Sequence, residues 1–366
     1  MPLYMDRHDG LEATAKSVAE AHQLDLEIQN HFNCKALTYW FDEGKRIAFC
    51  LIEGPNKKAV EEMHRNSHGL IPNQIVEVQS DMVEYFLGRI SDPESVKKSK
   101  EFINETAYRA IMYIDCKHIL TDLKQALKNG TGLSTTLNKI IRPAIKKYNG
   151  IEVKINSEGL MASFTSVSKS IKCAMQIQEE IKQTNKKLKS CKIFASIGLS
   201  TGYPITDKED FFGETVILAK RLSDISVNNE IVLSNEFKNE YEHKTSKSMN
   251  NLFRVINLSE QKFLSSLMDL TERIWNDENL NVVDFSRKLG LSKAQLYRKI
   301  TSLTGYSPNE FIKSYRLDKA LKLLENKHGN ISEIAFETGF STPSYFSKCF
   351  QKRFGITPSD YAEAIA

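Results

Sequence analysis

The sequence predicts a multidomain α+β chain in which two α+β domains precede an all-α domain. The chain has 366 residues. Single hydrophobic cores tend to stop growing near 250 to 300 residues, so more than one domain is expected at roughly this length. Strand and helix patterns alternate up to about residue 258, and only helical patterns follow. The helical part also contains an internal repeat.

The first expected domain covers residues 1–92. Apolar alternation predicts strands at 3–8, 36–41, 47–52 and 74–78, and helical spacing predicts helices at 14–32 and 57–67. This βαββαβ order is the split βαβ, or ferredoxin-like, arrangement. The apolar residues that set the expected buried face of the first helix are Val18, Ala21, Leu24 and Ile28.

The second expected domain covers residues 105–258 and follows a polar segment, 91–100, whose proline and charges are typical of a linker. Its pattern is again α+β. Strands are expected at 110–114, 193–199 and 231–234, a hairpin at 151–164, and helices at 133–148, 166–185 and 215–225. The third expected domain, 262–366, is entirely helical in pattern.

Composition limits the function classes. The balance of 50 basic and 46 acidic residues gives a net charge of +4, which is too small to indicate nucleic-acid binding unless the basic residues cluster locally. The six cysteines form no C-x-x-C pair, which argues against a disulfide framework or a zinc ribbon. The first residues lack a signal-peptide pattern, and no apolar run approaches the roughly 18 residues that span a bilayer. We therefore expect a cytoplasmic protein without a membrane partner.

The internal repeat aligns residues 285–292 with 334–341, and each copy continues through an amphipathic helix to a Gly-x-Ser/Thr-Pro ending. In each copy a glycine, Gly290 or Gly339, permits a left-handed turn. Ser292 or Ser341 is then expected to cap the next helix. A short helix, a glycine turn and a capped second helix are the pattern of a helix-turn-helix, so two such units are predicted.

Helical spacing separates the buried from the exposed side chains of the second helix in each copy. The buried set is Leu296, Ile300, Leu303, Phe346, Cys349, Phe350 and Phe354. The exposed set, suited to phosphate and base-edge contacts with double-stranded DNA, is Ser292, Lys293, Gln295, Arg298, Lys299, Ser341, Thr342, Ser344, Tyr345, Lys348 and Lys352. A plain helical bundle with solvated lysines is the alternative, and the two copies at a near-constant offset favour DNA binding.

Residues 262–366 resemble the AraC family of regulators. The resemblance rests on a joining helix at 311–324, the segment 331–335, the Gly-Phe-Ser turn at 339–341 and a closing Phe-x-x-x-Phe-Gly-x-Thr-Pro at 350–358. It implies two recognition helices that are held by one linking helix and that insert into successive major grooves. The implied function is a sequence-specific DNA-binding transcription regulator.

The middle region resembles the class III adenylate and guanylate cyclase domain through residues 111–115, 153–159, 210–213 and 219–222. The resemblance implies a nucleotide site. Its two carboxylates, Asp115 and Glu158, would hold divalent ions; Lys154 and Asp210 would face the purine, and Arg221 would contact the phosphates. Because cyclase domains usually work in pairs, a homodimer is also implied.

The sequence departs from the cyclase pattern in three places: at Glu158, where the family usually has Asp, in the segment 116–120, where the family has a small, flexible one, and at Ile217. Ile217 stands where the family has its transition-state asparagine, and losing one preorganised donor typically costs about 100- to 1,000-fold in rate. We therefore expect no catalytic residues and no enzyme activity. Nucleotide binding without turnover and a purely structural role both stay open, and an active cyclase fused to a DNA-binding domain is the alternative function.

Histidines are concentrated near the N-terminus, where five of the eight, His8, His22, His31, His64 and His68, fall within the first 68 residues. His64 and His68 are four residues apart and share a helical face, and imidazole suits nickel, copper or zinc. A pair of solvated surface histidines is the alternative. His31, at a helix end, is expected to be solvated and to interact with the helix dipole.

Residues 1–92 also resemble a small ferredoxin-like family that includes nickel-binding members. The segments that carry this resemblance are 1–8, 19–22, 39–41 and 49–50, together with the pair His64 and His68. It implies a site for Ni²⁺ or another divalent transition metal. The candidate ligands are His8, His22, His64 and His68, with Asp6 and Cys50 as secondary candidates.

The domain order leads to one hypothesis. A small effector, either a metal ion or a nucleotide, is sensed by the N-terminal or the middle domain and alters how the C-terminal domain engages DNA. Such coupling requires the effector to bind two states of the protein with different affinities. A metal-storage or chaperone role for the N-terminal domain is the remaining alternative.

Overall fold

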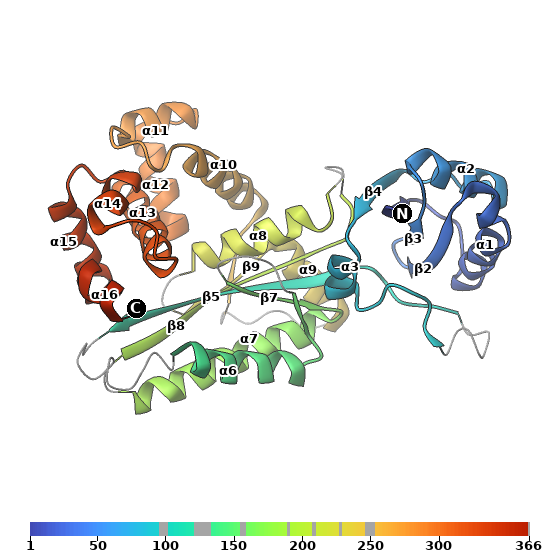
Figure 1. Cartoon of the computed structure of the whole chain (residues 1–366), viewed down its shortest axis with the longest axis horizontal. Coiled ribbons are helices and arrows are strands. Elements are labelled where there is room, and N and C mark those ends of the chain that lie inside the picture. The colour runs from blue at the N-terminus through green and yellow to red at the C-terminus, as the bar shows by residue number, and fades with distance from the viewer. Residues whose placement is uncertain are drawn as a thin grey trace.

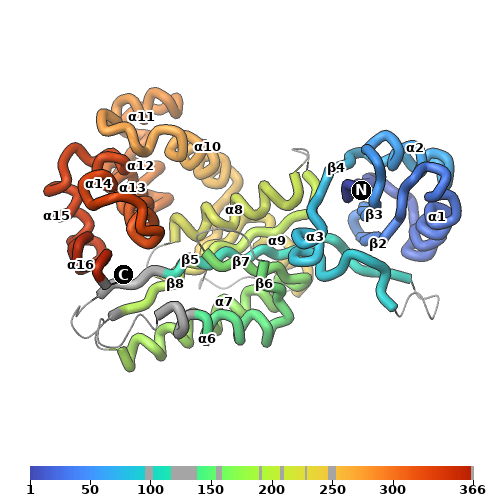
Figure 2. Tube along the Cα trace, viewed as in Figure 1, coloured from blue at the N-terminus to red at the C-terminus, as the bar shows by residue number. Residues whose placement is uncertain are grey.

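The computed structural model describes residues 1–94, 102–120, 133–153, 159–188, 191–206, 210–226, 229–245 and 253–364. The N-terminal and C-terminal domains lie at opposite ends of the middle domain (Figure 1). The two chain termini are correspondingly far apart, one in each outer domain (Figure 2). No helix of the described part has both the length and the apolarity needed to cross a bilayer.

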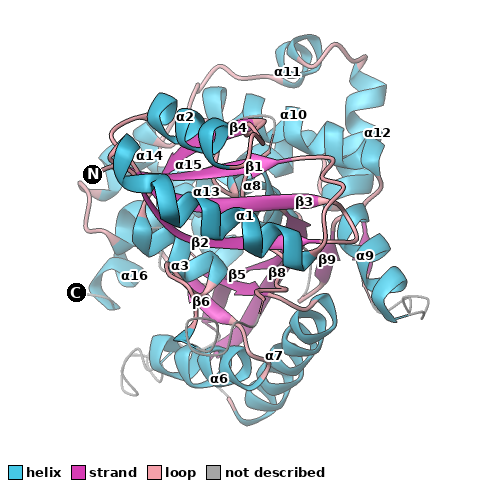
Figure 3. Ribbon diagram, turned by 90° about the vertical axis from the view of Figure 1, so that its right-hand side faces the viewer, coloured by secondary structure: helices cyan, strands magenta, loops and turns pink. Residues whose placement is uncertain are grey.

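The N-terminal domain has the predicted βαββαβ order. Its strands are β1 (Leu3–His8), β2 (Lys35–Asp42), β3 (Ile47–Glu53) and β4 (Gln74–Val78). They form an antiparallel sheet in the order β2-β3-β1-β4. Helices α1 (Ala15–Ile28) and α2 (Lys57–Ser67), with the 3₁₀ helix η1 (Gln29–Phe32), cover the face turned away from the middle domain (Figure 3).

The middle domain has a six-stranded sheet in the order β10-β9-β8-β5-β7-β6. Its strands are β5 (Arg109–Leu120), β6 (Ile151–Val153), β7 (Leu160–Phe164), β8 (Cys191–Gly202), β9 (Ile231–Leu233) and β10 (Arg254–Val255). β9 pairs in parallel with β8 and β10, whereas the other pairings are antiparallel. The predicted alternation of strands and helices is therefore confirmed for the described residues.

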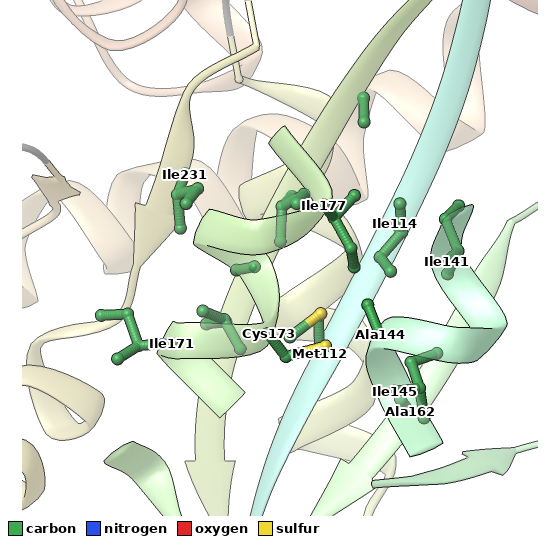
Figure 4. Close-up of a cluster of buried hydrophobic side chains, with 14 of the residues drawn as sticks. Met112, Ile114, Ile141, Ala144, Ile145, Ala162, Ile171, Cys173, Ile177 and Ile231 are labelled. Atoms are coloured by element: carbon green, nitrogen blue, oxygen red, sulfur yellow. The ribbon is translucent and has the colours of Figure 1, made fainter. Parts of the chain in front are cut away.

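Helices cover both faces of this sheet. On one face, α6 (Leu133–Lys147), α7 (Val167–Lys187) and α9 (Asn235–Thr245) contribute to a large apolar cluster with β5, β7, β8 and β9. Figure 4 shows side chains from α6 and α7 meeting those of β5 and β7 in this cluster. On the other face lies α8 (Gly213–Asp224). It packs so closely that a Cβ at Gly198 of β8 would lie 1.9 Å from the carbonyl oxygen of Ala219.

The C-terminal domain is all-α, as predicted. Its helices are α10 (Leu258–Ile274), α11 (Val282–Lys288), α12 (Lys293–Thr304), α13 (Pro308–Glu325), α14 (Ile331–Glu337), α15 (Pro343–Phe354) and α16 (Pro358–Ala364). Two apolar clusters form around α11–α12 and α14–α15. α13 gives Phe311 and Ile312 to the first cluster and Leu317, Ala320 and Leu324 to the second, so it links the two units.

Two helices connect the domains by sharing their cores. Helix α3 (Ser80–Leu87), absent from the sequence-based prediction, packs Phe86 into an apolar cluster that joins the N-terminal sheet to the middle domain. Arg109 and Ser163 of the middle domain donate to the carbonyl oxygen of Phe86, at 3.0 and 2.8 Å. α10 similarly packs with Leu222 and Ile225 of the middle domain. Of the expected linker 91–100, residues 95–100 lie outside the described residues.

Candidate functional site

A cluster of ionisable side chains is buried between the N-terminal sheet and its helices. Asp6 and His8 lie two residues apart on β1 and therefore point to the same face of the sheet, towards α2. Cys50 is the cross-strand partner of Asp6. His64, on α2, is fully buried, and its Nε2 lies 2.7 Å from Oδ2 of Asp6.

His64 faces a second acid through its other ring nitrogen. Its Nδ1 lies 3.3 Å from Oδ1 of Asp25 and 2.9 Å from Nε2 of His68. The candidate ligand atoms of Asp6, His8, Cys50 and His64 lie within 4.8 Å of one another, and those of Asp25, His64 and His68 do so as well. His64 therefore belongs to two adjoining groups, each of the size and donor type that suit one transition-metal ion.

Opposite charges compensate one another inside this cluster. Burial opposes ionisation of Asp6, yet the neighbouring His64 and His8 hold the pKa of that carboxyl well below its usual range. Burial would lower the pKa of His64, but Asp6 and Asp25 outweigh it and raise that pKa to about 10. Burial and the Asp6 charge raise the pKa of the Cys50 thiol. The cluster thus holds ionised groups in the buried interior of the domain.

The structure brings together three of the four predicted metal ligands. His8 and His64 share the first group, and His68 joins His64 in the second. His22 lies apart from both: its Nε2 is 3.1 Å from Oδ2 of Asp92, and its ring contacts Tyr39. The secondary candidates Asp6 and Cys50 are full members of the first group, and Asp25, which sequence reasoning missed, is a member of the second.

The two helix-turn-helix units have the predicted glycine turns. Gly290 and Gly339 adopt φ values of 67° and 76°, a region that favours glycine. Ser292 caps α12 and forms a capping box with Gln295. In the second unit the expected cap was wrong by one residue. Thr342, not Ser341, caps α15, because Pro343 occupies the first helical position, where its missing N–H costs nothing.

The predicted DNA contacts are exposed, with one exception. Ten of the eleven are exposed, namely Ser292, Lys293, Gln295, Arg298, Ser341, Thr342, Ser344, Tyr345, Lys348 and Lys352. Lys299 is half-buried, and its Nζ lies 5.0 Å from the ring centroid of Phe263 on α10. It is therefore turned from the open face towards α10. Tyr297, which sequence reasoning left out, is 55% exposed on α12, and such exposure of a large aromatic marks it as a further contact candidate.

Arg316 fixes the linking helix against both units. From α13 its guanidinium donates to the carbonyl oxygen of Trp275 at 2.7 Å and to that of Gly339 at 2.8 Å. Trp275 ends α10, and Gly339 is the turn of the second unit. The guanidinium thus ties α13 to the end of α10 and to the turn of the second unit.

The predicted nucleotide residues that the structure describes line two different cavities. Lys154 and Glu158 lie outside the described residues. Asp210 and Arg221 line one cavity, whereas Asp115 lines another, beside α13. Arg221 forms an ion pair with Asp269 of α10. The guanidinium expected to contact phosphates is thus paired with a carboxylate of the C-terminal domain.

The glycine-hinged helix pairs with their exposed, capped second helices define two helix-turn-helix units. Residues 285–364 match the family model described as a helix-turn-helix domain. Residues 4–78 match the model described as nickel responsive protein SCO4226-like. Both resemblances expected from the sequence at the two ends of the chain are therefore confirmed.

Curated relatives include transcription regulators. A probable transcription factor, PqrA of Proteus vulgaris, is 31% identical over 26% of this chain and 77% of its own length. The chain belongs to the AraC-type family of helix-turn-helix regulators. Histidine kinase P4 of Formosa agariphila is 42% identical over 29% of this chain but only 8% of its own length. The chain spans less than a third of the length of the first curated relatives that it matches.

Solved structures align with single domains. A transcriptional regulator of Chromobacterium violaceum with an AraC-type DNA-binding domain is 30% identical over 30% of this chain and 97% of its own, with a TM-score of 0.28. An adenylate/guanylate cyclase/hydrolase from Silicibacter pomeroyi is 24% identical over 38% of this chain and 82% of its own, with a TM-score of 0.32. That similarity is too low to define the middle domain, so its relation to cyclases stays a prediction.

Proposed function

We propose that the protein is a transcription regulator that binds specific sequences of double-stranded DNA through α12 and α15. The observation that carries this proposal is the pair of capped helices whose polar sides are exposed and whose apolar sides are locked on one linking helix. A helix presented in this way enters the major groove with its N-terminal residues against base edges. Arg298 and Lys348 are the proposed phosphate contacts, one from each helix.

Selection from a random pool of duplexes tests this function. The whole protein, bound to a support, is expected to enrich sequences with two short conserved blocks, one for each helix-turn-helix unit. The double variant Arg298→Ala, Lys348→Ala should enrich the same sequences more weakly. Recovery of a random pool unchanged after repeated rounds would refute sequence-specific binding.

The buried N-terminal cluster is the proposed site of an effector, Ni²⁺ or another divalent transition metal. Carboxylate, imidazole and thiol donors lie within reach of a single ion at Asp6, His8, Cys50 and His64. This donor set fits a divalent transition-metal ion. The match to the nickel-responsive family supports the same proposal. A bound ion would join β1, β3 and α2 by coordination, which ties the sheet to its helical layer.

Titration with Ni²⁺ tests the metal site and its regulatory role separately. Ni²⁺ binding is measured by calorimetry, and affinity for the selected duplex is measured with and without Ni²⁺. We expect His8→Gln to weaken Ni²⁺ binding at least tenfold, or about 1.4 kcal/mol, and His22→Gln, outside the cluster, to leave it unchanged. Binding of Ni²⁺ with no change in DNA affinity would favour storage or chaperone function over sensing.

The middle domain is proposed to lack cyclase turnover. By the cyclase resemblance, Ile217 stands at the position of the transition-state asparagine. Arg221 is paired with Asp269. Incubation of the protein with ATP or GTP and Mg²⁺ or Mn²⁺ is expected to give no cyclic nucleotide. A cyclic product that disappears in Asp115→Ala would establish the enzyme instead. The proposed homodimer is tested in the same preparation by light scattering.

A further inference from the structure

A polar cavity of about 530 Å³ lies where the three domains meet. Arg7 of β1 reaches it from the N-terminal domain. The loop between β8 and α8 supplies Asp210, α8 supplies Arg221, and α10 contributes Gln261 and Asp269. Its volume is in the range of about 300 to 1,000 Å³ that small-molecule sites occupy. Domain junctions are also preferred places for such sites.

Buried polar atoms without hydrogen-bond partners are concentrated in this cavity. They include Oδ1 of Asp210, Nε of Arg221, Oε2 of Glu236 and Oε1 of Gln261. Arg221 itself is only 8% exposed. Because buried polar groups in native proteins are nearly always paired, several unpaired atoms that line one cavity indicate that something polar belongs there.

The chemistry of the unpaired atoms describes their partner. Three of these four atoms are oxygens that accept hydrogen bonds, two of them on carboxylates, and Nε of Arg221 is the one donor. Both arginines of the cavity are already engaged. Arg7 pairs with Asp9 at 2.8 Å and donates to the carbonyl oxygen of Ile205 at 3.0 Å, and Arg221 pairs with Asp269. The cavity therefore has an excess of acceptors and negative charge.

We propose that this cavity binds a small organic cation that carries several N–H donors, such as a guanidinium or an amine, together with an acceptor that meets Arg221. Asp210 and Glu236 would receive the cationic end, and Gln261 would accept a further N–H. A nucleoside triphosphate has the wrong charge for this site, because its phosphates would meet unpaired carboxylate oxygens of Asp210 and Glu236 and only one unpaired donor, Nε of Arg221. None of the candidate metal ligands and none of the candidate DNA contacts lines this cavity.

Calorimetry on the whole protein tests the proposal with L-arginine and agmatine as probes and with succinate and ATP as anions. We expect at least one cationic probe to bind saturably with a Kd of about 1 mM or tighter, and neither anion to do so. The double variant Asp210→Asn, Glu236→Gln should weaken binding at least tenfold, and Gln261→Ala should weaken it less. Glu179→Gln, an exposed carboxylate on α7, is the matched control and should bind as the parent does.

Two results would overturn the proposal. One is the lack of saturable binding by either cation up to about ten times that concentration. The other is saturable binding of ATP that is lost in the Asp210→Asn, Glu236→Gln variant, which would assign the cavity to a nucleotide. Circular dichroism confirms that each variant is folded. If the double variant fails to fold, Gln261→Ala alone decides the outcome through its weaker binding of the cation.

Discussion

The two outer domains place their ionisable side chains in opposite environments. The N-terminal domain buries Asp6, His64 and Asp25 in one cluster, whereas the C-terminal domain keeps Arg298 and Lys348 at its surface. A few buried charges close together match a single small ion, because such an ion replaces the lost water with direct ligands. Charges spread over exposed helices match an extended polyanion, which is bound through many separate phosphate contacts. The contrast fits the two partners proposed for these domains.

Removing the buried ion-pair partner of His64 should cause the largest loss of unfolding free energy. Asp6→Ala leaves the buried His64 without the carboxylate at 2.7 Å, and breaking a buried ion pair typically costs about 3 to 5 kcal/mol. Urea unfolding in EDTA, followed by circular dichroism, should show a loss of that order. The control Glu61→Ala, whose carboxylate pairs with Arg65 on the surface of α2, should lose less than about 1 kcal/mol. Equal losses of unfolding free energy in Asp6→Ala and Glu61→Ala would contradict the idea that the N-terminal domain depends on its buried charges.

The exterior side of the contrast is tested by salt dependence. Arg298→Ala and Lys348→Ala should each lower the slope of log affinity against log salt by about one unit if the lost contact is to a phosphate. Lys299 lies beside Arg298 on α12 but packs on Phe263. Lys299→Ala should therefore leave the slope unchanged. Fluorescence anisotropy over about 50 to 200 mM salt measures all three. A slope that falls only for Lys299→Ala would move the DNA contact to the side of α10.

The smallest expected effect concerns the start of the second recognition helix. The hydroxyl of Thr342 accepts from the backbone N–H of Tyr345 at 3.2 Å, and removing such a cap costs about 1 kcal/mol. Thr342→Ala should therefore destabilise the C-terminal domain by about that amount, and exposed Ser341→Ala should stay within about 0.5 kcal/mol. Thermal unfolding of the two variants gives the comparison. The reverse order would restore the serine as the cap.

Local patterns predicted the element order well and the buried polar site only in part. Apolar spacing in α1 pointed to a face through Ala21 and Leu24, yet Leu24 is 41% exposed and the buried residues are Val18, His22 and Asp25. Asp25 was missed because a hydrophobic pattern does not reveal a carboxylate that is buried by pairing with a histidine. His64 was found because histidines four residues apart are visible without the fold.

Contacts between domains were beyond the sequence. Helix α3 was missed because it is short, and its last carbonyls are satisfied by Arg109 and Ser163, which lie at least 20 positions further along the chain. The pairing of Arg221 with Asp269 joins two domains across 48 positions. Neither spacing leaves a periodic signal. These contacts depend on how whole domains pack, which local propensity does not encode.

The length of the linking helix α13 sets the distance between the two helix-turn-helix units. Its 18 residues span about 27 Å at 1.5 Å per residue, and each end is anchored in a different apolar cluster. Inserting one residue would lengthen it by only about 1.5 Å but would turn the second unit through about 100°. Any change in the length of α13 therefore changes both the distance and the relative orientation of the two proposed recognition helices. The protein cannot adapt to a binding site with a different spacing by a small change in this helix.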